Sequence, residues 1–409
     1  MREERTSASK AGNRTGRDVQ GFDRNSVLLI SGAHLAHDIY PAFLGVLLPL
    51  LIDELGISLA MAGVLVSAIR WTTSLQPLLG HWADHTDTRY WVILTPATTG
   101  VCMSLLGLAP NSTVVVILLL TAGLSHAAFH PAGGALATRA SGNQWGRATS
   151  YFMTGGEIGR VIGPLLIAGI VAIGGLRLSP VAVVPGIVAS LILWRRFRRA
   201  AFLEIPAKPP ARIVSALRIG RQRLLLLSGA VVLRSFANVA IVIYYPTYAT
   251  RLGYPLIVAG VALAVYEIGA VAGTFSGGIL SDRHGRTRTM LIGLVAALPP
   301  MVGAVLLGPT WAGLALLFVA GFLWLSASSI ELALMQQLLP DNRSTAVGVT
   351  YFMRAAGAIV ATIAIGAFGD LLGLRTTLIG AIAIGAFAIG FLALIRDPRA
   401  EDAEAGSAF

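Results

Sequence analysis

The sequence predicts an all-α integral membrane protein with twelve transmembrane helices in two pseudo-symmetric six-helix bundles. Hydrophobic residues make up 55% of the 409-residue chain and charged residues only 12%, whereas soluble proteins carry roughly 25% charged residues. The mean hydropathy is +0.73. Apolar runs of about 20 residues, long enough for a helix to cross a bilayer, recur along the chain with short polar turns between them.

In chain order, the predicted spans are residues 27–52, 59–82, 90–109, 112–138, 147–173, 177–194, 224–249, 255–281, 289–308, 311–338, 344–368 and 375–395. They form an N-terminal bundle at 26–194 and a C-terminal bundle at 224–395, joined by a basic linker at 195–223. The tails at 1–25 and 396–409 are polar, and we expect them to be disordered.

The distribution of basic residues predicts the orientation in the membrane. If both termini are cytoplasmic, the external loops hold only Arg177, Arg251 and Arg375, and all other Lys and Arg lie in cytoplasmic segments or within spans. Cytoplasmic loops of membrane proteins are enriched in these residues. We therefore expect a multi-pass protein of the inner (plasma) membrane, embedded in the lipid bilayer, with both termini in the cytoplasm.

Motifs that recur about 200 residues apart indicate two similar halves. Tyr-Phe-Met at 151–153 recurs at 351–353, and Tyr-Pro at 40–41 recurs at 245–246. A Gly and Asp motif after the second span of each half predicts a cytoplasmic gate, because an aspartate at a helix end can pair with arginines or with a helix N-terminus. Its residues are Gly80 and Asp84 in the first copy and Gly278, Asp282, Arg283 and Arg286 in the second. A solvated turn explains the first copy equally well.

The composition disfavours several functional classes. The formal charge is +11, but the basic residues lie between apolar runs and not on aromatic-lined faces, so no nucleic acid partner is predicted. Neither Lys10 nor Lys208 lies in a phosphate-binding loop. His126 and His130 have the spacing of a helical metal pair, but no third ligand follows in a known motif. We predict no catalytic residue, no metal and no cofactor, and a chain that is not an enzyme.

Eight charged residues fall inside the predicted spans, each at a cost of about 2.5–3.5 kcal/mol at a helix centre. They are Asp38, Glu157, Glu267, Glu331, Arg70, Arg160, Arg234 and Arg354. At this cost, such groups must face an internal cavity or pair with one another. In one interpretation they act in function, and in the other they are ion pairs that fix helix orientation, with Arg234 and Arg354 neutralising Glu267 and Glu331.

His34 and Asp38 are four residues apart and share one face of a helix. A carboxylate beside a histidine in a partly desolvated site can bind and release a proton. Asp38 is therefore the predicted proton carrier, with His34 and His130 assisting. Pro131 directly after His130 predicts a kinked or broken helix that lines a cavity; a structural role for His130 is the alternative.

Three of the arginines inside the predicted spans indicate a second site, which would bind the substrate. Arg70, Arg234 and Arg354 could hold phosphonate, phosphate or carboxylate, because guanidinium groups bind these anions through paired hydrogen bonds. Tyr40 and Gln76 are the predicted neutral contacts of the same small-molecule substrate.

Six plus six spans, the basic linker and the acidic motif resemble the major facilitator superfamily, whose halves surround a site near the middle of the bilayer. A closer similarity is to the fosmidomycin-resistance family within it. This similarity rests on His34, Asp38 and Tyr40, on Gln-Pro-Leu-Leu-Gly at 76–80 and on Phe-His-Pro at 129–131. The resemblance implies a monomeric secondary transporter that exports small drug-like compounds, including a phosphonate antibiotic, in exchange for protons.

The fifth span resembles the glycine-rich motif of proton-coupled antiporters, where it is associated with export. The motif contains four glycines and a proline that can bend the helix: Gly155, Gly156, Gly159, Gly163 and Pro164. Glycines permit close backbone approach, and we expect them to form a smooth surface on which the two halves slide. Glu157 and Arg160 are three residues apart and are expected to pair along this helix.

Two other functions are compatible with these features. One is uptake of an organic anion by proton symport or facilitated diffusion, which would accumulate the compound where the exporter expels it. The other is a non-transporting sensor or scaffold on the same fold, which would tolerate loss of the charges inside the spans.

Overall fold

The computed structural model describes residues 22–83, 86–142, 144–199, 221–339 and 343–395, and all regular structure within these ranges is helical. Two 3₁₀ segments, Leu105–Leu108 and Leu176–Val183, follow α5 and precede α8. The α-helices of the N-terminal half are α1 (Arg24–Asp38), α2 (Phe43–Leu55), α3 (Leu59–Thr73), α4 (Gln76–Ala83), α5 (Arg89–Ser104), α6 (Ser112–Arg139), α7 (Trp145–Gly174) and α8 (Val184–Phe197).

In the C-terminal half, a π-helical turn at Ala240–Tyr244 joins the first two helices into one span. The helices of this half are α10 (Arg221–Val239), α11 (Tyr245–Arg251), α12 (Leu256–His284), α13 (Arg286–Leu307), α14 (Trp311–Leu338), α15 (Arg343–Leu372) and α16 (Leu374–Ala393).

Every predicted span has a helical counterpart. Within the described ranges, 11 helical segments are long and apolar enough to cross a membrane. The one remaining predicted span, at 59–82, is formed by α3 and α4, which are each too short to count alone. The prediction of an all-α fold with two sets of six spans is confirmed. Most of the predicted linker, residues 200–220, lies outside the described residues, so the domain boundaries stay a prediction.

Two spans that were expected to be continuous are interrupted. The first breaks at residues 39–42, between α1 and α2, where Pro41 lacks an N–H and its ring crowds the carbonyl four residues earlier. The second breaks at residues 74–75, and Pro77 then lies in the first turn of α4, where a missing N–H costs nothing. The first break places Asp38 at the end of a helix instead of in its middle.

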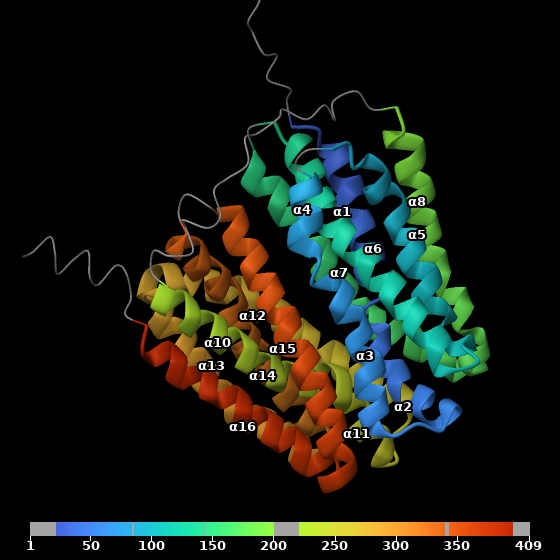
Figure 1. Cartoon of the computed structure of the whole chain (residues 1–409), viewed down its shortest axis with the longest axis vertical. Helices are drawn as coiled ribbons and strands as arrows, with labels where there is room; N and C mark the ends of the chain where they lie inside the picture. Colours follow the sequence, from blue (N-terminus) through green and yellow to red (C-terminus); the bar gives the residue numbers. More distant parts are fainter. Residues whose placement is uncertain (1–21, 84–85, 143, 200–220, 340–342, 396–409) are drawn as a thin grey trace, which may run out of the picture.

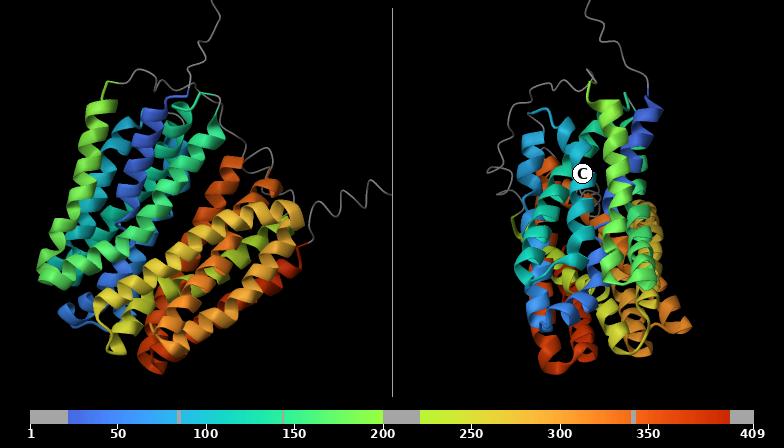
Figure 2. Two further views of the ribbon diagram at one scale, coloured as in Figure 1. Left: turned by 180° about the vertical axis from the view of Figure 1, so that it is seen from behind. Right: turned by 90° about the vertical axis from the view of Figure 1, so that its right-hand side faces the viewer.

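The two halves lie side by side and are closest at one end of the molecule. Figure 1 shows α2, α3, α11 and α15 close together there, with the helices of the two halves diverging toward the opposite end, and the views in Figure 2 show the same divergence. We call the divergent end the basic end, because helix termini with Arg24, Arg89, Arg139 and Arg195 lie there.

Glycines bring the two halves into backbone contact. A Cβ added to Gly63 of α3 would lie 2.5 Å from the carbonyl oxygen of Thr362 in α15, and one added to Gly366 would lie 2.3 Å from that of Leu59. Small residues at such positions allow helices in a membrane to pack closely. The closed end is therefore held by contacts that any larger side chain would disrupt.

A carboxylate also joins the halves at this closed end. Asp370 of α15 accepts hydrogen bonds from the backbone N–H groups of Leu59, at 3.0 Å, and Ala60, at 2.8 Å. These are the first two residues of α3, whose N–H groups have no partner within their own helix. Asp370 thus caps a helix of the other half, and this contact must break if the two halves separate here.

We expect Asp370→Ala to shift the protein toward a state that is open at this end. Loss of a capping carboxylate costs about 0.5–2 kcal/mol, and here the cost falls only on the closed arrangement. The measurement is the distance between spin labels at the exposed positions Glu54 and Leu371, in a Cys102→Ser background. A distance distribution identical to that of the parent protein would contradict a latch role for Asp370.

Candidate functional site

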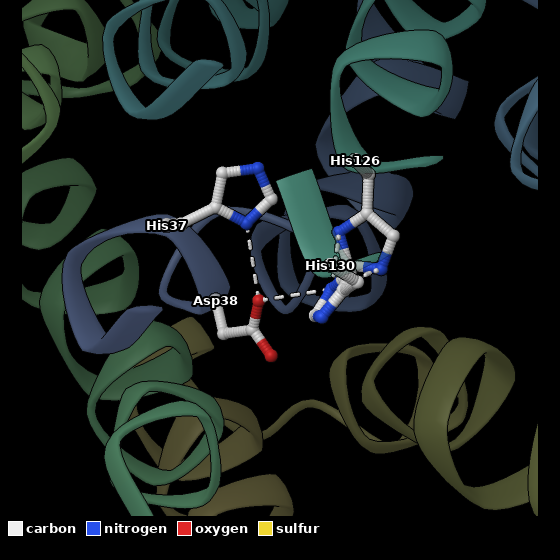
Figure 3. Close-up of side chains that lie close together, drawn as sticks. All are labelled: His37, Asp38, His126 and His130. Carbon is white, nitrogen blue, oxygen red and sulfur yellow. Dashed lines mark hydrogen bonds and ion pairs between the residues drawn. The ribbon is translucent and has the colours of Figure 1, made fainter. Parts of the chain in front are cut away.

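The candidate site is built around Asp38, in the last turn of α1. Its side chain is 7% exposed, and its neighbours in the same turn, His34 and His37, are 3% and 0% exposed. The C-terminal end of a helix carries partial negative charge, so a buried carboxylate there depends on nearby donors. Figure 3 shows three of its neighbours, His37 from α1 and His126 and His130 from α6, gathered on one side of the carboxyl group.

The two carboxylate oxygens of Asp38 face different histidines. Oδ2 lies 3.2 Å from His34 Nε2. Oδ1 lies 3.1 Å from His37 Nδ1 and 3.5 Å from His130 Nε2. Asp38 therefore contacts three imidazoles at once, all within the N-terminal half.

The surroundings of His34 require a proton beside Asp38. His34 Nδ1 lies 2.7 Å from the backbone oxygen of Phe152, and because a carbonyl oxygen only accepts hydrogen bonds, Nδ1 must donate. In a neutral imidazole the other nitrogen, Nε2, then carries a lone pair, and it faces Oδ2 of Asp38. Two acceptors at 3.2 Å repel unless a proton lies between them. The contact is therefore satisfied only when Asp38 or His34 holds an additional proton.

A chain of hydroxyl groups continues from His37. His37 Nε2 lies 3.1 Å from Thr99 Oγ1, which lies 2.8 Å from Ser125 Oγ, and Ser125 lies 3.1 Å from the backbone oxygen of Thr95. Each hydroxyl can donate or accept. Because the backbone oxygen of Thr95 only accepts, Ser125 donates to it, Thr99 donates to Ser125, and His37 Nε2 must donate to Thr99. The chain therefore fixes both the orientation and the neutral tautomer of His37, with the lone pair of Nδ1 facing Asp38.

Aromatic side chains pack on these rings. Phe129 stacks on His37 with ring centroids 4.2 Å apart, and Phe152 stacks on His34 at 4.0 Å. Both phenylalanines are buried. Because they keep bulk water from the imidazoles on these faces, the electrostatic interactions of Asp38 with the histidines are strengthened.

Helix α6 contributes His126 and His130, four residues apart on one face. His130 Nε2 lies 3.0 Å from His126 Nε2, and both rings are half-buried. Although Pro131 follows directly, α6 runs without a break from Ser112 to Arg139, so of the two predicted possibilities a broken helix is wrong. His37, Asp38, His126 and His130 each offer one ligand atom within 4.8 Å of the others, which is a spacing that a metal ion could bridge.

Helix α7 closes over the Asp38 site through its glycines. A Cβ on Gly156 would lie 2.5 Å from His34 Nε2 and 2.9 Å from Asp38 Oδ2. Gly155 and Gly159 approach the backbone of α1 equally closely, and Gly163 approaches that of Ile39, directly after α1. The expectation that these four glycines form a sliding surface between the halves is wrong, because they pack against α1 of their own half. The backbone oxygen of Pro164 does meet the other half, near Gly260 of α12.

We expect Gly156→Ala to impair transport strongly, because the added methyl group must displace His34 or Asp38. Overpacking of this kind costs about 1–3 kcal/mol. The matched control is Gly169→Ala on the same helix, where nothing lies within 4 Å of the new Cβ. Uptake into proteoliposomes measures the effect, and equal activity of the two variants would contradict the packing argument.

One ion triad connects the halves. Arg160 of α7 binds Glu157 on its own helix, and its Nε donates to Glu267 of α12 at 3.3 Å. The Arg160 side chain is 38% exposed, whereas those of Glu157 and Glu267 are 14% and 10% exposed. The predicted pairing of Glu157 with Arg160 is present, and Glu267 pairs with Arg160 and not with the arginines proposed for it.

A second ion triad lies within the C-terminal half. Glu331 of α14 is fully buried and binds both Arg234 of α10 and Arg354 of α15. Arg354 Nε donates to it at 2.7 Å, and Arg234 also donates to the backbone oxygen of Trp324 at 3.0 Å. Arg234 is buried and Arg354 is 34% exposed. Arg234 and Arg354, two of the three arginines predicted to hold substrate, are therefore already paired with the carboxylate of Glu331.

Comparison with known proteins identifies the family. The model of the Major Facilitator Superfamily matches residues 31–362. The chain belongs to the Major Facilitator Superfamily. Two relatives are the fosmidomycin resistance protein of Escherichia coli (strain K12), 27% identical over 330 residues, and the uncharacterized MFS-type transporter YfnC of Bacillus subtilis (strain 168), 26% identical over 365 residues. The first match covers 79% of this chain and 80% of the relative; the second covers 86% and 88%.

Solved structures confirm the superfamily fold. A bacterial homologue of the human lysosomal transporter Spinster, in an inward-facing and unoccupied conformation, aligns with a TM-score of 0.75 at 16% identity, over 90% of this chain and 95% of that one. The nucleoside transporter NupG aligns with a TM-score of 0.72 at 12% identity, over 90% and 98%. The sequence-based resemblance to the superfamily is confirmed, and the chain is a membrane transporter.

Three other predicted substrate contacts differ in their surroundings within this transporter. Arg70 of α3 is half-buried, and its guanidinium has no hydrogen bond or ion pair among the described residues. Gln76 is half-buried at the start of α4. Tyr40 is fully buried, and its hydroxyl accepts from Gly186 N at 2.7 Å and lies 3.1 Å from the backbone oxygen of Ala182. Tyr40 thus packs the α1–α2 break against α8, whereas Arg70 keeps donors available for an anion.

The second copy of the Gly and Asp motif lies at the end of α12, at the basic end. Asp282 lies 3.9 Å from Arg286, and Arg286 also donates to the backbone oxygen of Ala333 in α14 at 3.0 Å. Gly80 of α4 packs near Pro131 of α6. Asp84 lies outside the described residues, so its gating role stays a prediction. The other two predicted gate residues, both on α12, are Gly278 and Arg283.

Several residues of the site had no signal in the sequence. Thr99, Ser125 and Phe152 become neighbours of the histidines only because α5, α6 and α7 pack around α1. A threonine or serine in an apolar helix is common, and its rotation toward a neighbouring helix depends on packing. Asp370 follows the predicted eleventh span at 344–368, so it is not among the eight charged residues that fall inside the predicted spans.

Proposed function

We propose that this transporter is a proton-coupled exporter of a small drug-like or anionic compound that works by alternating access. Asp38 carries the proton, and His34 and His130 assist it. The observation that supports this proposal most directly is the contact between His34 Nε2 and Asp38 Oδ2 at 3.2 Å. This contact is favourable with an additional proton and unfavourable without one, so the site has two states that differ by a proton.

Arg70, Gln76 and the exposed part of Arg354 form the proposed substrate contacts. Of the four arginines inside the spans, Arg160, Arg234 and Arg354 pair with acids, whereas Arg70 has no acidic partner in the described part of the chain. A desolvated guanidinium favours an anionic ligand. The relative named as a fosmidomycin resistance protein and the glycine-rich α7 support export of a drug-like compound. The protein is proposed to act as a monomer, because the site is built within one chain.

The basic end is proposed to face the cytoplasm, with both termini on that side, because it carries most of the arginines of the helix ends. With this orientation, the helices of the two halves diverge toward the cytoplasm and lie closest at the opposite side. Release of substrate outside then requires closure at the basic end, where Asp282 and Arg286 are proposed to act, and opening at the end that Asp370 holds shut.

The test is transport by the purified protein in liposomes. A thermal-shift screen against phosphonates, sugars, organic acids and antibiotics first identifies a ligand, since binding raises the stability of the native state. We then expect an imposed pH gradient to drive that ligand against the inward flow of protons. Accumulation together with protons would instead establish symport, and transport indifferent to the gradient would rule out proton coupling.

A further inference from the structure

The three imidazoles on the Oδ1 side of Asp38 have the spacing of a metal-binding site. A tetrahedral ion bound to imidazole nitrogen at about 2.0–2.1 Å sets neighbouring ligand atoms about 3.3 Å apart. The observed separations are 3.1 Å from His37 Nδ1 to Asp38 Oδ1, 3.5 Å from Asp38 Oδ1 to His130 Nε2, and 3.0 Å from His130 Nε2 to His126 Nε2. All four ligand atoms lie within 4.8 Å of one another. Figure 3 shows the four side chains that carry them.

The neighbours of these residues orient them as the surroundings of metal sites commonly do. Metal-binding histidines usually use the second ring nitrogen for a hydrogen bond that fixes the ring. His37 does this through its Nε2, which lies 3.1 Å from Thr99 Oγ1. The second oxygen of Asp38 is likewise engaged by His34, whose far nitrogen is anchored at 2.7 Å on the backbone of Phe152.

The donor set selects the kind of ion. Imidazole nitrogens favour zinc, copper and nickel, whereas magnesium and calcium prefer oxygen ligands and keep more of them. Three imidazoles and one carboxylate therefore favour a divalent transition metal. The sequence predicted no metal because no third ligand follows His126 and His130, and the structure supplies the other two from α1.

We propose that His37, Asp38, His126 and His130 bind a divalent transition-metal ion of the zinc class, and that the bound ion blocks transport. The metal takes the lone pairs that would otherwise accept protons, so its binding releases any proton held on these ligands into solution. Asp38 then stays a carboxylate and cannot be protonated. The blocking step rests on the proposed proton coupling, whereas the binding step does not. His130, with 19% of its side chain exposed, gives the ion a route into the site.

Binding is tested on the full-length protein, purified with a tag that contains no histidine and stripped with a chelator. Titration calorimetry with Zn²⁺ is expected to give one site per chain, and Mg²⁺ none. Co²⁺ is the spectroscopic probe, and absorption bands of a tetrahedral ion are expected in the wild-type protein without any substitution. No Zn²⁺ binding, or Co²⁺ bands of an octahedral ion only, would overturn the proposal.

Variants assign the ion to these residues. His126→Gln and His37→Gln are expected to weaken Zn²⁺ binding at least tenfold, while His284→Gln, at an exposed position near the end of α12, leaves it unchanged. Thr99→Val, which removes the hydroxyl that orients His37, is expected to weaken binding about 10- to 100-fold, and Thr99→Ser to restore it. Zn²⁺ affinity that none of the cluster variants changes would place the ion elsewhere and overturn the site.

Transport assays with Zn²⁺ distinguish failure of the proposed metal site from failure of the proposed proton coupling. Micromolar Zn²⁺ is expected to inhibit transport by the wild-type protein. For His126→Gln, with each rate expressed relative to that variant's own rate without Zn²⁺, the inhibitory Zn²⁺ concentration is expected to be at least tenfold higher than for the wild-type protein. Stoichiometric binding without inhibition would overturn the blocking step. If Zn²⁺ binds but transport ignores the pH gradient, the proposed function fails and the metal site stands. If the gradient drives transport and Zn²⁺ does not bind, only this inference fails.

Discussion

Asp38→Asn is expected to reduce proton-driven transport to the level of protein-free liposomes while leaving the fold intact. An amide cannot take up or release a proton, so the variant stays in one protonation state. It does reproduce the donor of a protonated carboxyl group, because its NH₂ can donate to His34 Nε2. We therefore expect the thermal unfolding midpoint in detergent to stay close to that of the wild-type protein.

The matched control is Asp53→Asn, which removes a carboxylate from an exposed position at the end of α2. This variant is expected to transport normally, since Asp53 lies outside the histidine cluster. Substrate exchange without a pH gradient separates coupling from binding, and Asp38→Asn is expected to retain measurable exchange. Gradient-driven transport by Asp38→Asn at the wild-type rate would rule out Asp38 as the proton carrier.

Much of the fold was predictable because the bilayer imposes a simple rule on sequence. A helix must be apolar for about 20 residues to cross it, and all twelve predicted spans have helical counterparts. The interruptions at 39–42 and 74–75 were missed, although Pro41 and Pro77 mark both. In a hydropathy profile, Pro41 and Pro77 lie within apolar runs and do not interrupt the signal. Their effect is on backbone hydrogen bonding, which hydropathy does not measure.

The candidate site was only partly predictable. His34 and Asp38 are neighbours within one helix turn, and a spacing of four residues is enough to place them together. The contacts of Asp38 with His130, and of Glu267 with Arg160, join different helices. Such contacts depend on how helices rotate and slide against each other, and an amino-acid sequence without aligned relatives carries no direct record of this. The equal numbers of acids and arginines indicated pairing without showing which residues pair.

Of the two ion triads, one lies within a single half and the other connects the two halves. The triad of Glu331, Arg234 and Arg354 lies within one half, so it need not change when the halves move. The bond from Arg160 to Glu267 crosses between the halves, and Arg160 holds a second acid, Glu157, on its own helix. Arg160 can therefore release Glu267 during the cycle and keep Glu157 as its partner, so it is not left unpaired in a low-dielectric region.

The stability of the protein is expected to depend strongly on the triad of Glu331, Arg234 and Arg354. Glu331→Gln should destabilise the protein by about 3–5 kcal/mol, because removing one partner of a buried ion pair leaves an uncompensated charge. Here two arginines lose their shared anion, and a glutamine can accept from them only through its single carbonyl oxygen. The measurement is the thermal unfolding midpoint in detergent. Glu54→Gln, an exposed glutamate at the end of α2, is the control and is expected to have no effect.

Removing all three charges together should be far milder than removing one. In the triple variant Arg234→Met, Glu331→Leu and Arg354→Met, no charge is left unpaired, and apolar replacement of a buried ion pair is often neutral or stabilising by about 1–4 kcal/mol. We expect its unfolding midpoint to lie well above that of Glu331→Gln. A triple variant that is less stable than the single one would mean that the triad stabilises the fold through its hydrogen bonds to Trp324 and Ser328, and not through balance of charge.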